Sequence, residues 1–326
     1  MKKEPIYVEL PIRADMDALW RHTQTPELHE RWDLRFSSIT YLPRPNDGSP
    51  QRFRYRTRIG FSLDIEGTGE TKARTDLPDG GRLSTLRFGS EQTISLIRSG
   101  GGYWRYKPAG EGVVFSTRFD YETRFGAAGR LFDKLLFRPL FGFATAWSFD
   151  LLRLWLERGI SPASLIRQAL VHYGCVAALS LLWLYQGLVP KLLFAETGEA
   201  ELLRTAGLFA GFETEAAYVL GAAEMCAALL IAVLHRRRWL FALHGAALAI
   251  LCAVALATAP ETAAAPFGPV PLTLSMLGLG SLAALTLRDL PDAGRCKRKP
   301  EAPALSNTPS NGGTRDDIHL SASIGN

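Results

Sequence analysis

Hydrophobic residues gather in four long, almost uninterrupted stretches in the second half of the chain. They cover residues 169–189, 216–234, 239–258 and 270–287. As a helix, each stretch of about 18–21 residues can cross a hydrocarbon core of about 30 Å. The stretches leave almost no polar face for a soluble bundle, so the pattern predicts an all-α four-helix transmembrane bundle over residues 167–288.

Shorter segments of alternating apolar and polar residues occupy the first half. Near its start, Asp15 is placed to cap one short helix, and Thr25 with Pro26 to begin a second that ends by residue 33. Glycine-rich segments, among them 78–81 and 100–102, separate the later strands. The alternation predicts strands over residues 6–10, 35–42, 51–60, 63–74, 82–89, 93–106 and 112–124.

A long helical segment closes this half of the chain. Its apolar residues recur at helical spacing from 127 to 157, and Pro139 is expected to break or kink it. These elements predict an α+β soluble domain over residues 1–158. A linker over residues 159–166 then leads into the bundle, which places this domain close to the bilayer.

Charge is sorted between the two sides of the predicted bundle. The net charge is +5, and the whole excess belongs to residues 1–166. By the positive-inside rule, the sorting predicts a multi-pass protein of a bacterial-type inner membrane with both termini in the cytoplasm. The polar segment 289–326 is expected to be a disordered basic tail. On the side of the bundle opposite the cytoplasm, the only basic residues are Lys191 and Arg204. The basic residues on the predicted cytoplasmic side are Arg153, Arg158, Arg167, Arg236, Arg237, Arg238, Arg288, Arg295, Lys297, Arg298 and Lys299.

The first half resembles the SRPBCC superfamily, whose START-like or polyketide-cyclase-like members have a helix-grip fold. The resemblance covers residues 4–158 and rests on the order of elements and on segments 26–33, 101–106, 137–140 and 144–150. It implies a curved sheet that wraps the long helix around a cavity for an apolar ligand. Some members of that superfamily are cyclases or hydratases, some carry lipids, and many have no assigned chemistry.

The second half resembles the DoxX-like family of four-helix membrane proteins. The resemblance covers residues 167–288 and rests on segments 183–191, 221–224 and 266–269, together with Glu196. Relatives are associated with quinone-linked sulfur or redox metabolism, so the resemblance allows a quinone as cofactor. The chain itself has no metal or nucleotide motif.

Five aromatic residues of the first half are candidates for the wall of a ligand cavity, with packing in the core as the alternative. No Ser/His/Asp order or metal-ligand spacing accompanies them. We therefore assign no catalytic residue and no metal, and whether the chain is an enzyme stays open. The candidates are Trp32, Tyr103, Trp104, Phe143 and Trp147.

Glu224 is the main candidate for a polar site in the membrane half. An ionised carboxyl within a span is costly, so it is expected to face the bundle or a wet cavity. One interpretation is a neutral acid that forms a hydrogen bond to another helix. The alternative is a binding site for a proton or for a ligand such as a quinone head group. Counted from the same end of the bundle, Ser180 and Ser275 lie at a similar depth.

Three further residues extend this candidate membrane site. His172 and His244 lie nearer the basic end, where they contact each other or a head group, or simply pack in the core. Lys191 either extends to the interface or pairs with Glu196 or Glu215.

Arginines at positions 52, 54, 56 and 58 line one face of a predicted strand. They are either solvated and paired with acids such as Asp64, Glu66 and Glu122, or held against anionic lipid. Nucleic acid is not an expected partner, because no basic recognition helix or aromatic base platform accompanies them.

Three functions stay open at this point. The first is a membrane-anchored protein that binds an apolar or amphipathic ligand, a lipid or a quinone. The second is a quinone-linked oxidoreductase subunit with a redox partner protein. The third is a membrane scaffold that binds another protein.

Overall fold

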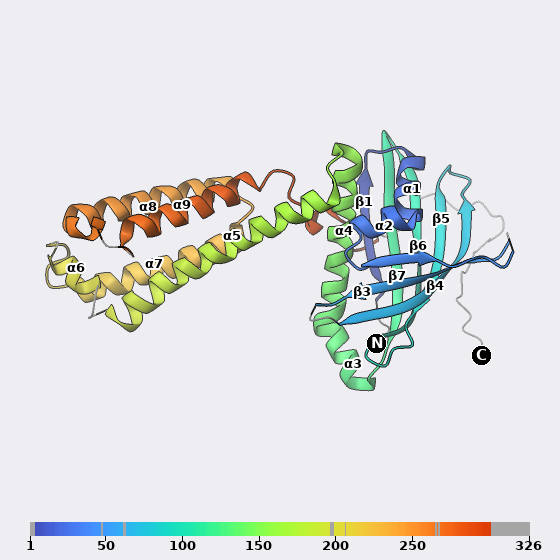
Figure 1. The fold of residues 1–326 in the computed structure, drawn as a ribbon, viewed down its shortest axis with the longest axis horizontal. Coiled ribbons are helices and arrows are strands. Elements are labelled where there is room, and N and C mark those ends of the chain that lie inside the picture. The colour runs from blue at the N-terminus through green and yellow to red at the C-terminus, as the bar shows by residue number, and fades with distance from the viewer. Residues whose placement is uncertain are drawn as a thin grey trace, which may run out of the picture.

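Two structural units follow each other along the chain, a curved sheet with its helices and an elongated helical bundle (Figure 1). The structure is a computed structural model. It describes residues 4–46, 48–60, 63–195, 199–205, 207–264, 266 and 268–300.

The first unit is a seven-stranded antiparallel sheet around one long helix. Its strands lie in the order β1-β7-β6-β5-β4-β3-β2, which confirms the predicted α+β helix-grip fold. The strands are β1 (Ile6–Ile12), β2 (Ser38–Tyr41), β3 (Gln51–Arg58), β4 (Asp64–Asp76), β5 (Arg82–Gly89), β6 (Ile97–Ala109) and β7 (Gly112–Thr123). The helices are α1 (Met16–Gln24), α2 (Pro26–Trp32), α3 (Gly126–Phe132) and α4 (Arg138–Arg158).

The two short helices start where the sequence predicts. The Asp15 carboxylate accepts hydrogen bonds from the backbone N–H groups of Asp17 and Ala18, at 2.9 and 3.0 Å. Helix α2 begins at Pro26, and Thr25 makes no side-chain capping bond. Proline has no N–H that would need a partner at the first helical position, so it favours a helix start even without a side-chain cap.

Glycines inside the strands make room for aromatic rings, and one expectation about them was wrong. Gly100 and Gly102 lie within β6 and do not end a strand. A Cβ on Gly100 would collide with the Phe88 ring, and one on Gly69 with the Phe53 ring. Each ring therefore occupies the place that a side chain on the neighbouring strand would take.

The long helix has an irregular turn where Pro139 was expected to disturb it. A π-helical turn, η1 (Asp133–Phe137), joins α3 to α4 directly before that proline. Proline has no N–H to donate to a carbonyl of the preceding turn. A local widening of the helix lets that carbonyl accept from another N–H group.

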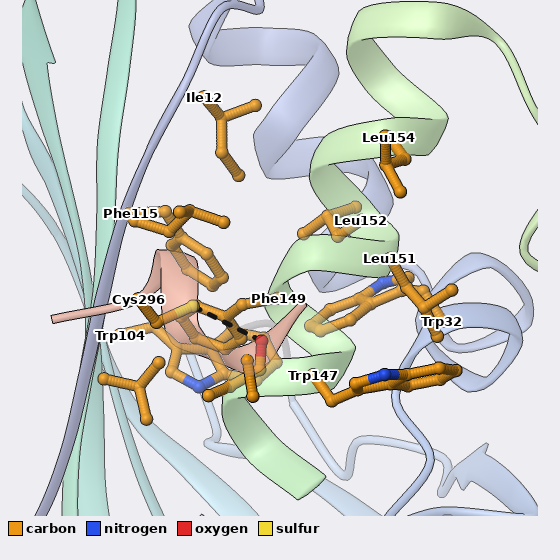
Figure 2. Packing of buried hydrophobic residues seen from close by; sticks show 14 of the residues in the cluster. Ile12, Trp32, Trp104, Phe115, Trp147, Phe149, Leu151, Leu152, Leu154 and Cys296 are labelled. Carbon is orange, nitrogen blue, oxygen red and sulfur yellow. Dashed lines mark hydrogen bonds between the residues drawn. The ribbon is translucent and has the colours of Figure 1, made fainter. Parts of the chain in front are cut away.

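Residues of α4 and the sheet form the main hydrophobic core (Figure 2). Phe149 of α4 stacks on Phe115 of β7 with ring centroids 4.5 Å apart. Trp32 is fully buried, and its indole N–H donates to the His22 carbonyl at 3.0 Å. This packing fixes α4 against the sheet and defines one wall of the space described below.

The second unit is a bundle of apolar helices. Three are long and apolar enough to cross a membrane: residues 162–193, 213–234 and 238–258. The fourth predicted span, α9 (Pro269–Leu285), is a shorter apolar helix of 17 residues. The other elements are α5 (Pro162–Leu188), η2 (Val189–Leu193), α6 (Glu199–Thr205), α7 (Glu213–Leu234), α8 (Arg238–Thr258) and η4 (Pro260–Ala264).

The expected linker over residues 159–166 is much shorter in the structure. Gly159, with φ +68°, ends α4, and Pro162 already begins α5 behind the N-cap Ser161. Leu165 and Ala169 of α5 are buried in the core of the first unit. The first membrane helix therefore extends directly into that core, with only three residues between two helices.

The expected disordered tail is wrong for residues 289–300, which we call the strap. Leu290, Ala293 and Cys296 are buried in the core of the first unit, and Lys297 pairs its backbone with Glu9 on the edge of β1. Burial raises the pKa of the Cys296 thiol to about 12, and the thiol donates to the Ala146 carbonyl at 3.3 Å (Figure 2). Residues 301–326 lie outside the described residues.

Asp150 of α4 holds the strap in place. Its fully buried carboxylate accepts hydrogen bonds from Arg153 at 2.6 Å and from the backbone N–H of Asp292 at 2.8 Å. Arg295 lies 3.8 Å away, and Arg158 pairs with Asp289. A buried carboxylate needs such partners, because an unpaired one carries the full cost of desolvation.

Replacing Asp150→Ala should release the strap. The lost bonds to charged groups are worth about 1.5–3 kcal/mol, so trypsin should cut the strap at Arg295 or Lys297 at least about tenfold faster. Limited proteolysis with mass spectrometry measures this. Asp76→Ala removes an exposed carboxylate and is the control. Equal cleavage of both variants and the parent would contradict the assignment.

Candidate functional site

A cavity of about 590 Å³ lies between the inner face of the sheet and the helical segment α3–α4. Its walls are mostly aromatic and aliphatic. They include Phe36, Tyr55, Leu86, Phe88, Trp104, Phe119, Phe137 and Phe141. The volume falls within the range of about 300–1,000 Å³ that is typical of small-molecule sites.

One buried ion pair enters this apolar wall. Arg35 donates to both carboxylate oxygens of Asp33, from Nε at 2.8 Å and from Nη2 at 2.6 Å. His29 Nε2 lies 2.9 Å from the same carboxylate, to which it donates. Burial raises the pKa of Asp33, but the charge and hydrogen bonds of Arg35, together with His29, hold it well below its usual range. Asp33 is therefore ionised and orients Arg35.

The guanidinium group of Arg35 keeps one edge for a ligand. Its carbon lies 5.5 Å from the ring centroids of Phe36 and Phe119, and 5.7 Å from that of Phe141. Nε and Nη2 are committed to Asp33, and Nη1 has no acceptor within the part of the chain that the structure describes. Two directed N–H donors are thus held among aromatic rings.

Two tyrosine hydroxyls of the wall already have acceptors. Tyr41 donates to the Gln24 carbonyl at 2.7 Å, and Tyr55 to the Gly89 carbonyl at 3.2 Å. Burial raises the pKa of Tyr55 to about 12 and also raises that of Tyr41. Both hydroxyls stay protonated at physiological pH. Two arginines line the cavity, and of these Arg35 is buried, whereas Arg58 is exposed and paired with Asp64.

The five aromatic candidates separate into three groups. Tyr103 and Trp104 line the cavity, as the sequence suggested. Trp32 and Trp147 are core residues, packed beside α4 on the side away from Cys296 (Figure 2). Phe143 is exposed on the outer face of α4. None of these last three lines the cavity, because bulk and hydrophobicity do not reveal which elements pack against a side chain.

Sequence reasoning missed Arg35. Asp33 and His29 entered the sequence analysis only within segment 26–33, at the end of the second short helix. The spacing of His29 and Asp33, four residues apart at the end of α2, was the available signal. Such a pair lies on one helix face and can hold a cation that follows closely in the sequence.

Two of the four arginines on the face of β3, Arg56 and Arg58, are paired with acids that the solvated alternative named. Arg56 contacts Glu66 at 3.2 Å and Asp64 at 3.7 Å, and Arg58 contacts Asp64 at 3.4 Å. Glu122 bonds Ser99 instead. Exposed pairs of this kind contribute little to stability.

The membrane unit contains a second buried ion pair that the sequence did not predict. Lys191 Nζ lies 3.1 Å from Glu224 Oε2, and both side chains are buried. The expectation that Lys191 extends to the interface was therefore wrong, and its partner is not Glu215. Glu196 lies outside the described residues. Glu224 is 11 residues from the start of α7, roughly 16 Å at 1.5 Å per residue, which is near the middle of that helix.

Two glycines bring the helices of this pair together. A Cβ on Gly221 of α7 would lie 2.7 Å from the Gly187 carbonyl oxygen of α5, closer than any real side chain comes. The helices therefore approach through their backbones, as small residues allow in membranes. This contact positions the π-helical turn η2, which carries Lys191, against Glu224.

His172 and His244 do not contact each other through any described bond. Trp183 donates to His244 Nδ1 at 3.0 Å, so His244 is neutral and donates from Nε2 to the Met276 carbonyl at 3.2 Å. His172 donates from Nδ1 to the Ala283 carbonyl at 3.0 Å and bonds His235 through Nε2 at 2.9 Å. Both histidines therefore join helices, as their packing alternative predicts.

The two serines have different surroundings. Ser275 is exposed and bonds the Pro271 carbonyl of its own helix at 2.8 Å. The Ser180 hydroxyl is buried without a hydrogen-bond partner among the described residues. Only Ser180 therefore faces the interior at the depth expected for the polar site.

Comparison with known proteins identifies the bundle and the family. Residues 180–280 match the model of the DoxX-like family. The chain is 47% identical over 203 residues to the uncharacterized membrane protein YndG of Bacillus subtilis (strain 168), covering 62% of this chain and 75% of that one. The chain belongs to the YndG family. It is thus a membrane protein with a DoxX-like domain, and this confirms the resemblance of the second half.

Solved structures similar to this member of the YndG family match its first unit. A STAR-related lipid transfer protein from Xanthomonas axonopodis is 14% identical, with a TM-score of 0.35, over 46% of this chain and 84% of that one. The Zhui aromatase/cyclase from Streptomyces sp. R1128 is 13% identical, with a TM-score of 0.35, over 48% and 98%. At these scores the START-like assignment depends on the strand order and the enclosed helix.

Breaking the Lys191–Glu224 pair should destabilise the bundle. Removing one partner of a buried pair typically costs about 3–5 kcal/mol, and removing both costs far less. We expect Glu224→Gln and Lys191→Met each to lower the unfolding temperature of the detergent-solubilised chain. The double variant should recover most of the loss. Additive losses in the double variant would show that the two residues act independently.

Proposed function

We propose that the chain binds one apolar or amphipathic ligand in the cavity of its first unit and exchanges that ligand with the membrane around its bundle. The observation that supports this most is an apolar cavity of about 590 Å³ whose lining includes a buried, oriented cation, Arg35. No catalytic step is part of the proposal.

The cavity dimensions indicate the size of the ligand. With a share of about 30 Å³ for each water-sized group, the volume accommodates roughly twenty non-hydrogen atoms. That corresponds to a single-chain lipid or to a quinone ring with a short apolar tail. Burial of such a ligand is favourable by about 25 cal/mol for each Å² of apolar surface.

The chemistry of Arg35 indicates the head group. Arg35 and Asp33 together carry no net charge, and Nη1 supplies N–H donors among aromatic rings. A carbonyl, hydroxyl or carboxyl oxygen at the end of an apolar ligand would accept these hydrogen bonds. Apolar walls with one placed polar group are the usual way to bind and orient such a molecule.

The same proposal places the first unit in the cytoplasm. Arg236 bonds the Pro291 carbonyl at 2.9 Å, which brings the basic turn after α7 to the end of the bundle nearest the sheet. Acidic residues Glu201, Glu213 and Glu215 lie toward the other end. Under the positive-inside rule this arrangement gives a multi-pass protein with its basic end inside.

Filling the cavity should remove the ligand. Ala144 of α4 lines the cavity, so Ala144→Trp occupies space without leaving a charge unpaired. After mild purification of the full chain, solvent extraction and mass spectrometry should find a stoichiometric amphiphile in the parent. We expect at least about tenfold less in the variant, which corresponds to 1.4 kcal/mol.

Ala109→Trp is the matched control, because Ala109 is exposed at the end of β6 and does not line the cavity. It should retain the ligand. The proposal fails if the parent carries no ligand and binds none in lipid or quinone titrations, or if Ala144→Trp carries as much as the control.

A further inference from the structure

The segment from α3 to the first half of α4 presents large apolar side chains to the outside. Leu131, Leu135, Leu136, Leu140 and Phe143 are each between 48% and 68% exposed. Exposed apolar residues are common singly, but a contiguous set along one helical segment indicates an interaction surface. We call these five residues the α3–α4 surface.

This surface continues a helix face that α5 covers elsewhere. Residues 140, 143, 147, 151 and 154 recur at spacings of three and four, so they share one face of α4. Toward the end of α4, Leu151 and Leu154 are buried in one cluster with Leu165 and Ala169 of α5. Toward the start of α4, Leu140 and Phe143 on the same face are exposed. The uncovered half therefore faces the side from which the membrane helix departs.

The cavity opens next to this surface through a ring of apolar side chains. Six residues both line the cavity and are exposed by 37–56%: Leu34, Ile59, Leu63, Ile94, Phe132 and Leu140. Leu140 belongs to both the ring and the α3–α4 surface. An opening rimmed by such residues is unfavourable in water but suits contact with an apolar phase.

The arrangement of the two units places the bilayer on this side. Figure 1 shows α4 between the sheet and the bundle, lying across the direction in which α5 leaves. Three helices of the bundle are long and apolar enough to cross a membrane. If they cross it, the membrane surface lies parallel to α4. Arg130 and Lys134 are exposed on the same segment. Apolar residues interspersed with basic ones are typical of segments that lie in the head-group layer.

We propose that the α3–α4 surface rests on the bilayer in which the chain's own helices are embedded, so that the cavity opens at the membrane. This extends the proposed function, because the ligand could then pass between the cavity and the bilayer without crossing water. The contact itself does not depend on the ligand, because most of the surface lies outside the cavity.

Photo-crosslinking of the full chain in lipid nanodiscs with anionic lipid tests this contact. Phe143, which does not line the cavity, is replaced by the photoreactive benzoylphenylalanine, and crosslinked lipid is measured by mass spectrometry. Asn46 is the matched control position. It is exposed in the connection between β2 and β3. Figure 1 shows this blue connection at the end of the sheet away from the bundle.

The proposal requires at least about tenfold more lipid adduct at position 143 than at position 46, as expected for a side chain in the head-group layer. Equal adduct at both positions overturns it. So does a crosslink at position 143 to a second copy of the chain or to another protein in place of lipid. Because position 143 lies outside the cavity, lipid adduct there would stand even if no ligand were found.

Discussion

The buried carboxylate of Asp150 joins the two units of this protein. It lies on the helix that fills the curved sheet, and it binds the backbone of the strap that follows α9, the last helix of the bundle. Together with the three-residue passage from α4 into α5, this gives two connections between sheet and bundle. Two connections at separate points restrict rotation, whereas one linker would leave the sheet free to turn. The orientation of the cavity relative to the membrane depends on them.

Each candidate site contains a buried ion pair, Arg35 with Asp33 in the first unit and Lys191 with Glu224 in the second. The two pairs differ in which hydrogen-bonding groups they leave available. Lys191 and Glu224 meet where two helix backbones touch at Gly187 and Gly221, so that pair closes a helix contact. Arg35 is bidentate to Asp33 yet keeps Nη1 toward the cavity. Burying a pair is costly in both places. Only Arg35 is placed to recover part of that cost by binding another molecule.

Periodicity was enough to predict the helix-grip elements and the apolar spans, because each depends on local patterns along the chain. The strap was missed because its three anchors, Leu290, Ala293 and Cys296, span only seven residues of a segment rich in charge, proline and glycine, which is too short a pattern to predict burial. Phe143 and Trp147 look alike in sequence. Tertiary packing buries Trp147 in the core and leaves Phe143 exposed. Arg35 was overlooked because its role depends on Asp33 and on two rings from distant elements, Phe119 of β7 and Phe141 of α4.

The central claim is that the cavity is held open toward the membrane and contains an amphiphile. A high-resolution electron cryo-microscopy map of the full chain in lipid nanodiscs tests it most directly. The account predicts elongated density in the cavity with one polar end at Arg35, and the start of α4 within the head-group layer. An empty cavity whose opening faces away from the bilayer would contradict it.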